Sequence, residues 1–185
     1  MSLIGDSNRS GQAYALTVIT PIVPGEEQAL RDYLEGLPRD TGSPLAKLRG
    51  THFGRWVILS ELLDDGDAKP APDDLGCQYL IFTSNFDGSL HAYLDELCER
   101  LAPEAREIWG RCIGCPERAS GRSLRDYLEH NQIGCGFFYA AVNQSTVADI
   151  QAALAQRDKL IEFVARTQGM QAAALQRAFV NDFRS

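Results

Sequence analysis

Four short runs of consecutive apolar residues constrain the fold of this 185-residue chain more than any other feature of its sequence. The runs lie at residues 18–19, 56–59, 79–82 and 137–139, and they are rich in β-branched and aromatic residues, which favour strands. A strand in a sheet with one wet face alternates apolar and polar residues, whereas these runs are apolar on both faces. We therefore expect a sheet that is covered on both sides.

Segments with helical spacing of apolar residues separate and follow these runs. The expected order is strand 13–20, helix 25–37, strands 48–59 and 78–83, helix 87–101, helical pieces 104–111 and 123–129, strand 135–142, a long helix that Thr146 caps and Gly169 interrupts, and a terminal helix 170–183. This order predicts an α+β fold of the ferredoxin-like βαββαβ type, with an antiparallel sheet, helices on one face and extra C-terminal helices. Right-handed crossovers would place the first strand between the third and the fourth, with the second at an edge.

Composition divides the chain into a tail and one domain. Residues 1–12 are rich in Gly, Ser, Asn and Asp, so we expect a flexible tail, followed by a single domain over residues 13–185. The connection at residues 64–76 holds five aspartates and two prolines, which is typical of an exposed, mobile loop. Asp87, at the start of the second helix, is the expected N-cap.

Charge and apolar content exclude several classes of partner. The net charge of −7 argues against nucleic acid or an anionic membrane surface, because both require a basic footprint. No apolar run reaches membrane-spanning length, and residues 1–12 lack the apolar core of a signal peptide. The chain has five cysteines, an odd number that cannot all pair in a disulfide framework. We therefore expect a soluble, cytoplasmic protein.

The two middle strands predict a polar corner that is the best candidate site. If they pair antiparallel, the start of the first lies beside the end of the second, which brings His52 near Ser84, Asn85 and Asp87. A neutral imidazole beside a carboxylate can act as a general base near pH 7, so His52 is the candidate catalytic residue. The alternative is a structural histidine that satisfies the polar corner and holds the hairpin together.

Strict alternation along the strand at residues 48–59 places His52, Gly54 and Trp56 on one face and Arg55 on the other. Gly54 leaves space on that face. Trp56 is therefore the expected wall of a ligand pocket next to His52.

Cys112 and Cys115 form a CxxC motif, but its context is not that of a redox or metal site. Redox pairs precede a helix, whose N-terminus lowers the thiol pKa, whereas this pair follows a helix and ends at Pro116. A zinc site requires two more ligands, and the other three cysteines form no second CxxC. We expect no metal site.

In element order and strand character, residues 13–164 resemble the dimeric α/β-barrel proteins of the ferredoxin-like type. That group includes antibiotic-biosynthesis-type monooxygenases, muconolactone isomerase-like enzymes, haem-degrading enzymes and dye-decolourising peroxidases. The resemblance implies a homodimer that closes two sheets into a barrel, and a ligand cavity. It also implies haem as a possible cofactor, with His130 as an axial ligand. The simpler account of His130 is a histidine at a helix C-terminus, where the dipole favours it.

The expected function is therefore a homodimeric domain that binds an apolar or aromatic small molecule, or haem, with Trp56, Ser84, Asn85, Asp87 and His130 as ligand contacts. Oxygenase or isomerase chemistry at His52 is one possibility. A non-catalytic dimerisation or ligand-sensing module is the alternative, and a regulatory domain of the ACT type shares the same element order. Fold alone does not decide between them.

Overall fold

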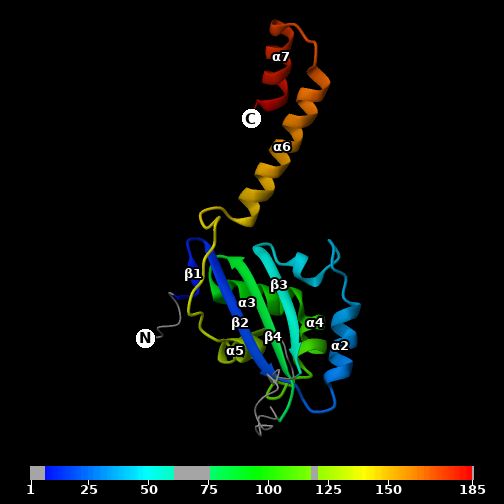
Figure 1. Ribbon diagram of the computed structural model, residues 1–185, viewed down its shortest axis with the longest axis vertical. Coiled ribbons are helices and arrows are strands. Elements are labelled where there is room, and N and C mark those ends of the chain that lie inside the picture. The colour runs from blue at the N-terminus through cyan, green and yellow to red at the C-terminus, as the bar shows by residue number, and fades with distance from the viewer. Residues whose placement is uncertain (1–6, 61–75, 118–120, 185) are drawn as a thin grey trace, which may run out of the picture. The chain divides into compact units, whose positions relative to one another are not determined.

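The computed structural model describes residues 7–60, 76–117 and 121–184. They divide into two compact units, Met1–Val147 and Ala148–Ser185, whereas the sequence predicts one domain over residues 13–185. The first unit is a sheet with helices, and the second is a pair of helices (Figure 1). The loop predicted at residues 64–76 lies outside the described residues, except for its last residue. Within the described ranges, no helix has both the length and the apolar character that crossing a membrane requires.

The sheet of the first unit contains β1 (Arg9–Ser10), β2 (Ala13–Pro21), β3 (Thr51–Leu59) and β4 (Tyr79–Asp87). Their order is β1-β2-β4-β3, and every neighbouring pair is antiparallel. The α+β class is therefore confirmed. So is the expected position of the chain's first long strand beside the third, with the second at an edge.

The fourth strand predicted at residues 135–142 is wrong, so the ferredoxin-like order is not completed. Other segments already bond to the edge of β2 that does not pair with β4. The Ala15 amide donates to the Asn8 carbonyl (2.8 Å), and farther along β2 the Ile133 amide donates to the Thr17 carbonyl (2.8 Å). Residues beyond Ile133 therefore leave the sheet, and Phe137 is 84% exposed. An apolar run forms a strand only where a backbone edge is open to it.

Part of the predicted tail belongs to this edge. Residues 9 and 10 form β1, and the side chain of Asn8 is completely buried. Asn8 Nδ2 donates to the Ala15 carbonyl (3.0 Å), and Asn8 Oδ1 accepts from the Cys135 amide (2.8 Å). One asparagine thus connects the N-terminal segment, β2 and the chain that follows the last helix of the unit.

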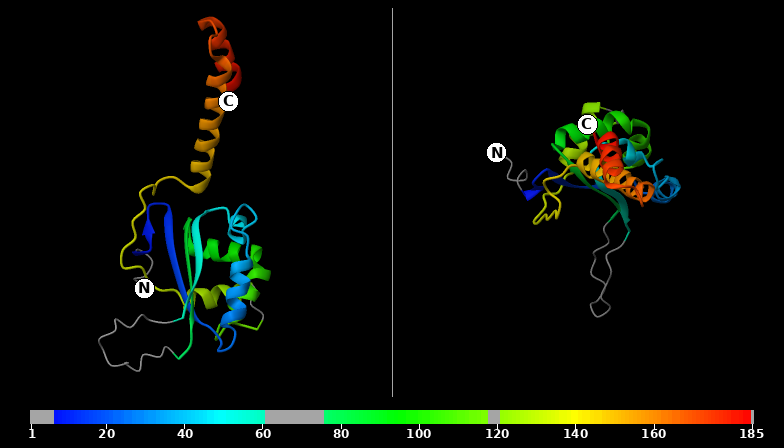
Figure 2. Two further views of the ribbon diagram at one scale, coloured as in Figure 1. Left: turned by 45° about the vertical axis from the view of Figure 1, so that its right-hand side comes forward. Right: turned by 90° about the horizontal axis from the view of Figure 1, so that it is seen from above.

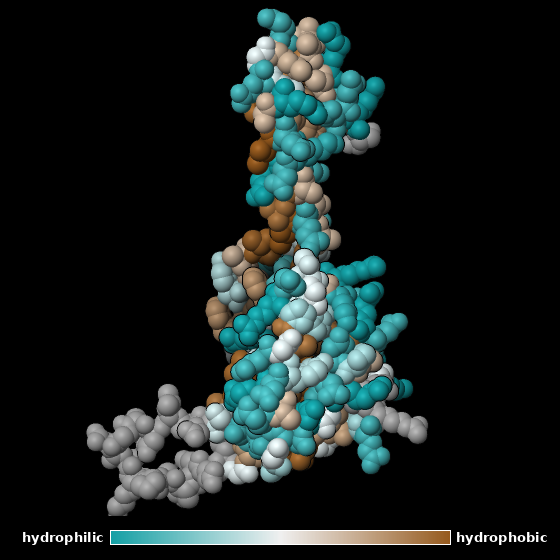
Figure 3. Space-filling model, turned by 90° about the vertical axis from the view of Figure 1, so that its right-hand side faces the viewer, coloured by the Kyte–Doolittle hydropathy of each residue, from teal (hydrophilic) through white to brown (hydrophobic). Residues whose placement is uncertain are grey.

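The helices of the first unit cover one face of the sheet (Figure 2). They are α2 (Glu27–Gly36), the 3₁₀ helix η1 (Pro44–Lys47), α3 (Leu90–Arg100), α4 (Ala102–Trp109) and α5 (Gly121–His130). The core between sheet and helices includes the fully buried side chains of Leu16, Val18, Leu80, Phe82, Phe86, Leu94, Leu97, Ile108, Trp109, Leu124 and Leu128. The outer surface on the α2 side is mostly hydrophilic (Figure 3), as expected for amphipathic helices.

The start of α3 differs from the prediction by two residues. Ser89, not Asp87, is the N-cap, and its hydroxyl accepts from the Ala92 amide (3.3 Å). Asp87 is the last residue of β4 and makes contacts of its own. Serine and aspartate have nearly equal cap preference, so the sequence alone did not separate them.

The other face of the sheet carries no helix in the described part of the unit (Figure 2). Phe53 and Val57 of β3 are 77% and 41% exposed there. They alternate with Trp56 and Ile58, which pack on the core. The uncovered face thus carries exposed apolar side chains, but polar ones such as Arg55, Thr83 and Asn85 lie among them, so it is less apolar than predicted.

The second unit contains α7 (Ala172–Phe183) and α6 (Val147–Thr167) apart from its first residue, Val147, which belongs to the first unit. Both helices were predicted, as was the break between them near Gly169, which has a positive φ of 78°. The helices pack through an aromatic cluster of Phe163, Phe179 and Phe183. An ion pair between Arg166 and Asp182 joins them.

Candidate functional site

A β-bulge at His52 changes the predicted corner. Thr51 pairs with Phe86 and Phe53 pairs with Asn85, so His52 is an extra residue in β3. The bulge shifts the phase of the strand by one residue. His52 therefore does not share a face with Trp56, and the prediction that it does is wrong.

His52 and Asp87 do meet, as predicted. His52 Nε2 donates to Asp87 Oδ1 (2.8 Å), and Asp87 Oδ2 accepts from the Val147 amide (2.7 Å). The two side chains are only 16% and 13% exposed. Because both carboxylate oxygens are bonded within the protein, this geometry supports the structural alternative for His52. Its predicted catalytic role stays a prediction.

We expect Asp87→Ala to lower the free energy of unfolding by about 2 kcal/mol, because it leaves the His52 imidazole and the Val147 amide without their acceptor. Urea denaturation followed by circular dichroism measures the loss. Asp87→Asn, which keeps one side-chain oxygen, is the control and should lose less. Wild-type stability in Asp87→Ala would show that the hydrogen bonds of Asp87 to His52 and Val147 are not structural.

Ser84 and Asn85 lie on opposite faces of β4, so they do not belong to one site with His52 and Asp87. Ser84 is 1% exposed in the core, where its hydroxyl lies 2.7 Å from the Tyr93 hydroxyl. Burial raises the pKa of Tyr93. Asn85 faces the uncovered side and lines a depression of about 490 Å³ with Phe53 and Arg55. Of these two predicted ligand contacts, only Asn85 is within reach of a ligand.

His130 is the last residue of α5 and is exposed. It lines neither the 490 Å³ depression nor the pocket of about 560 Å³ beside Trp56. The sequence predicted His130 as a haem ligand only by resemblance. That role stays a prediction.

The CxxC segment extends the sheet rather than forming a reactive centre. Cys112 bridges to Ile22 just beyond β2, and the Thr20 hydroxyl donates to Cys112 Sγ (3.3 Å). Burial raises the pKa of Cys112 and of Cys115 to about 11, so both are thiols at neutral pH. No cluster of three metal-ligating side chains occurs among the described residues.

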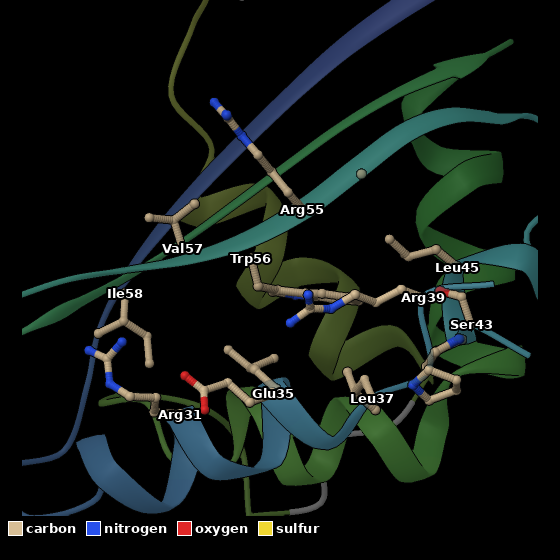
Figure 4. Close-up of a pocket in the computed structure, with 14 residues that line it drawn as sticks. Arg31, Glu35, Leu37, Arg39, Ser43, Leu45, Arg55, Trp56, Val57 and Ile58 are labelled. Atoms are coloured by element: carbon tan, nitrogen blue, oxygen red, sulfur yellow. The ribbon is translucent and has the colours of Figure 1, made fainter.

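Trp56 lines a pocket of about 560 Å³ at the β3 edge of the sheet (Figure 4). One wall is α2, another is the chain from Leu37 to Leu45, and the third is β3. Trp56 stacks on Phe82 with ring centroids 5.2 Å apart. Its indole nitrogen is buried and has no hydrogen-bond partner among the described residues. Trp56 therefore lines a pocket, but not the predicted one, because His52 is not among the residues that line it.

Gly54 shapes this pocket by admitting Leu45. A Cβ at position 54 would lie 2.7 Å from Leu45 Cδ1, closer than real side chains pack. The space that the sequence predicted at Gly54 is thus filled by a residue of the pocket wall.

The pocket carries charge as well as apolar surface. Arg31 and Glu35 approach from α2, and Arg39 extends toward Trp56 (Figure 4). Arg55 points to the opposite side of β3 (Figure 4), where its Nε donates to the Thr83 hydroxyl (3.1 Å). The sequence did not single out Arg31 or Arg39. Gly54, an unexpected glycine within an apolar strand, was the one signal near them.

Comparisons with protein-family models, curated proteins and solved structures found no match to this chain.

Proposed function

We propose that the first unit is a binding module for a small molecule, which it holds in the pocket beside Trp56. The observation that carries the proposal is the pocket itself. Its volume of about 560 Å³ lies in the range of small-molecule sites, and aromatic, aliphatic and charged side chains line it. Binding without catalysis is favoured because His52, the predicted catalytic residue, bonds to Asp87 and does not line this pocket.

Ligand binding is expected to move the indole N–H signal of Trp56 in a ¹H–¹⁵N spectrum. The chain has two tryptophans, and Trp109 is 1% exposed in the core, so its signal is an internal reference. A fragment library of aromatic and aliphatic compounds supplies the probes, and Trp56→Phe assigns the signal. Hits should shift Trp56 more than Trp109.

Ser43→Phe is the matched control for this experiment. Ser43 lines the pocket, and its side chain makes no cap bond to η1, so the substitution adds bulk without removing a contact of that kind. It should abolish the Trp56 shift and leave the fold intact. Failure of every fragment to shift Trp56, or equal shifts in Ser43→Phe, would contradict the proposal.

Homodimerisation through the uncovered sheet face is a second candidate function. The exposed side chains of Phe53 and Val57 favour it, because a second copy would remove this apolar surface from water. Pairing of two such faces would also enclose the depression beside Asn85 and Arg55. A barrel interior of this kind is what the resemblance implies.

We expect sedimentation at micromolar concentration to give twice the chain mass of 20.4 kDa. Phe53→Asp places a charge in the dimer contact and should give the monomer. Phe137→Asp is the control, because Phe137 is 84% exposed and lies outside the sheet, so it should leave the dimer intact. A wild-type monomer would exclude this candidate.

A further inference from the structure

The outer edge of β3 is an open edge of the sheet in the first unit. β3 pairs with β4 on one side, and no strand of the described part of the chain pairs with its other side. Nor does any backbone hydrogen bond join residues 53–59 to a described element other than β4. Alternate residues of such a strand direct their N–H and C=O groups outward, where these groups are available to another chain.

β3 lacks the features by which edge strands are usually protected. It is nine residues long and contains neither lysine nor proline, and its bulge at His52 lies near its start. Its one arginine, Arg55, bonds to Thr83 of β4. At the opposite edge of the sheet, β1 is only two residues long. Natural sheets shorten, charge or bend their edge strands to prevent pairing with other chains, so the long edge of β3 is suited to such pairing.

The pocket beside Trp56 runs along this edge. Five consecutive residues of β3, from Gly54 to Ile58, line it. Trp56 and Ile58 point toward α2, whereas Arg55 and Val57 point away from it (Figure 4). Because neighbouring residues point to opposite faces, a pocket that touches all five reaches the edge of the strand, where the backbone groups lie. Five residues of a strand span about 13 Å, the length of a short extended peptide.

We propose that the ligand of this pocket is a short peptide, which pairs with β3 as an added antiparallel strand and places an aromatic side chain beside Trp56. The outward groups of β3 recur every second residue, about 6.7 Å apart, and the backbone of another extended peptide matches this spacing. This inference rests on the proposed binding function and adds the class of ligand to it.

The two faces of β3 define the side chains of the peptide. In an antiparallel pair, residues directly opposite each other have their side chains on the same face. The residue opposite Trp56 would point toward α2, where Leu34 and Leu45 provide apolar surface, so an aromatic side chain fits there. The residues opposite Arg55 and Val57 would lie on the uncovered face of the sheet, where a glutamate and a valine match them.

Methylation of the peptide backbone tests whether it pairs with β3. The probe is the capped pentapeptide acetyl-TVFET-amide, and isothermal titration measures its binding to the full 185-residue chain. Only alternate N–H groups of an added strand face the strand beside it. Of two isomers, N-methylated at the valine or at the phenylalanine, one should therefore bind about tenfold more weakly and the other should bind like the parent. Both isomers have the same side chains and mass, so each is the control for the other.

Amide hydrogen exchange of the protein locates the pairing. Bound pentapeptide should slow exchange at alternate residues of β3 between Gly54 and Ile58, and it should leave exchange in β4 unchanged, because β4 already pairs on both sides. Slower exchange of the β3 amides at rising protein concentration, without peptide, would show that a second copy occupies the edge. That result would overturn the peptide.

The outcomes separate this inference from the proposed function. Equal weakening by both methyl groups, or by neither, would overturn strand addition and leave the pocket as a binding site for the side chain. Fragments that shift Trp56 while the pentapeptide fails to bind would overturn the peptide alone. No binding of either kind of probe to the wild type would overturn both proposals.

Discussion

Gly11→Ala is expected to lower the free energy of unfolding by about 3 kcal/mol, from backbone strain and a steric clash together. Gly11 has a positive φ of 61°, which side chains other than glycine rarely adopt. A Cβ there would also lie 2.1 Å from the Asn143 carbonyl oxygen. The clash involves backbone, so the chain at residue 143 must move to relieve it.

Gly25→Ala separates the two causes. Gly25 also has a positive φ (94°), but no atom lies within 4 Å of the position of its added Cβ. It should therefore lose only the strain energy, about 1 kcal/mol. Urea denaturation of both variants measures the difference. Equal losses would mean that the close approach of the Asn143 carbonyl to Gly11 adds nothing to the cost of the substitution.

Asn8→Ala is expected to lower the free energy of unfolding by about 3 kcal/mol, because it removes two buried hydrogen bonds at once. The Ala15 carbonyl and the Cys135 amide would both lose their partner. Hydrogen exchange at the Cys135 amide should quicken by more than exchange in β4. This readout locates the loss at the edge of β2.

Asn143→Ala is the control for Asn8. Its side-chain amide donates to the Ser10 hydroxyl at 3.3 Å and is half-buried, so its loss should cost less than about 1 kcal/mol. If both asparagine variants lost the same small amount, Asn8 would be an ordinary surface residue. That result would contradict its position in the sheet edge.

The sequence by itself determined most of the helices, the three long strands and the core-facing stripes of the helices. Helical spacing puts Leu30 and Leu94 toward the core, whereas the buried faces of β2 and β4, with Leu16 and Phe82, became clear only in the structure. These patterns depend only on the periods of a strand and of a helix, which residues within one element set among themselves. The terminal helices and the break at Gly169 follow from the same local rules.

For His52, the sequence predicted the contact but not the face of the strand. Its contact with Asp87 was predictable, because it depends on the antiparallel pairing of two neighbouring strands. Its face was not, because the bulge depends on how β3 aligns with β4 after both have packed. The separation of Trp56 from His52 follows from that one extra residue.

The tertiary structure alone decided which segment occupies the edge of β2 and where the pocket lies. Residues 135–142 have the character of a strand, but Asn8 and the segment 131–133 bond to that edge instead. Arg31 and Arg39 become pocket residues only because α2 and the chain after it pack beside β3. Competition for a backbone edge and the meeting of distant side chains are long-range events, and local periodicity carries no information about them.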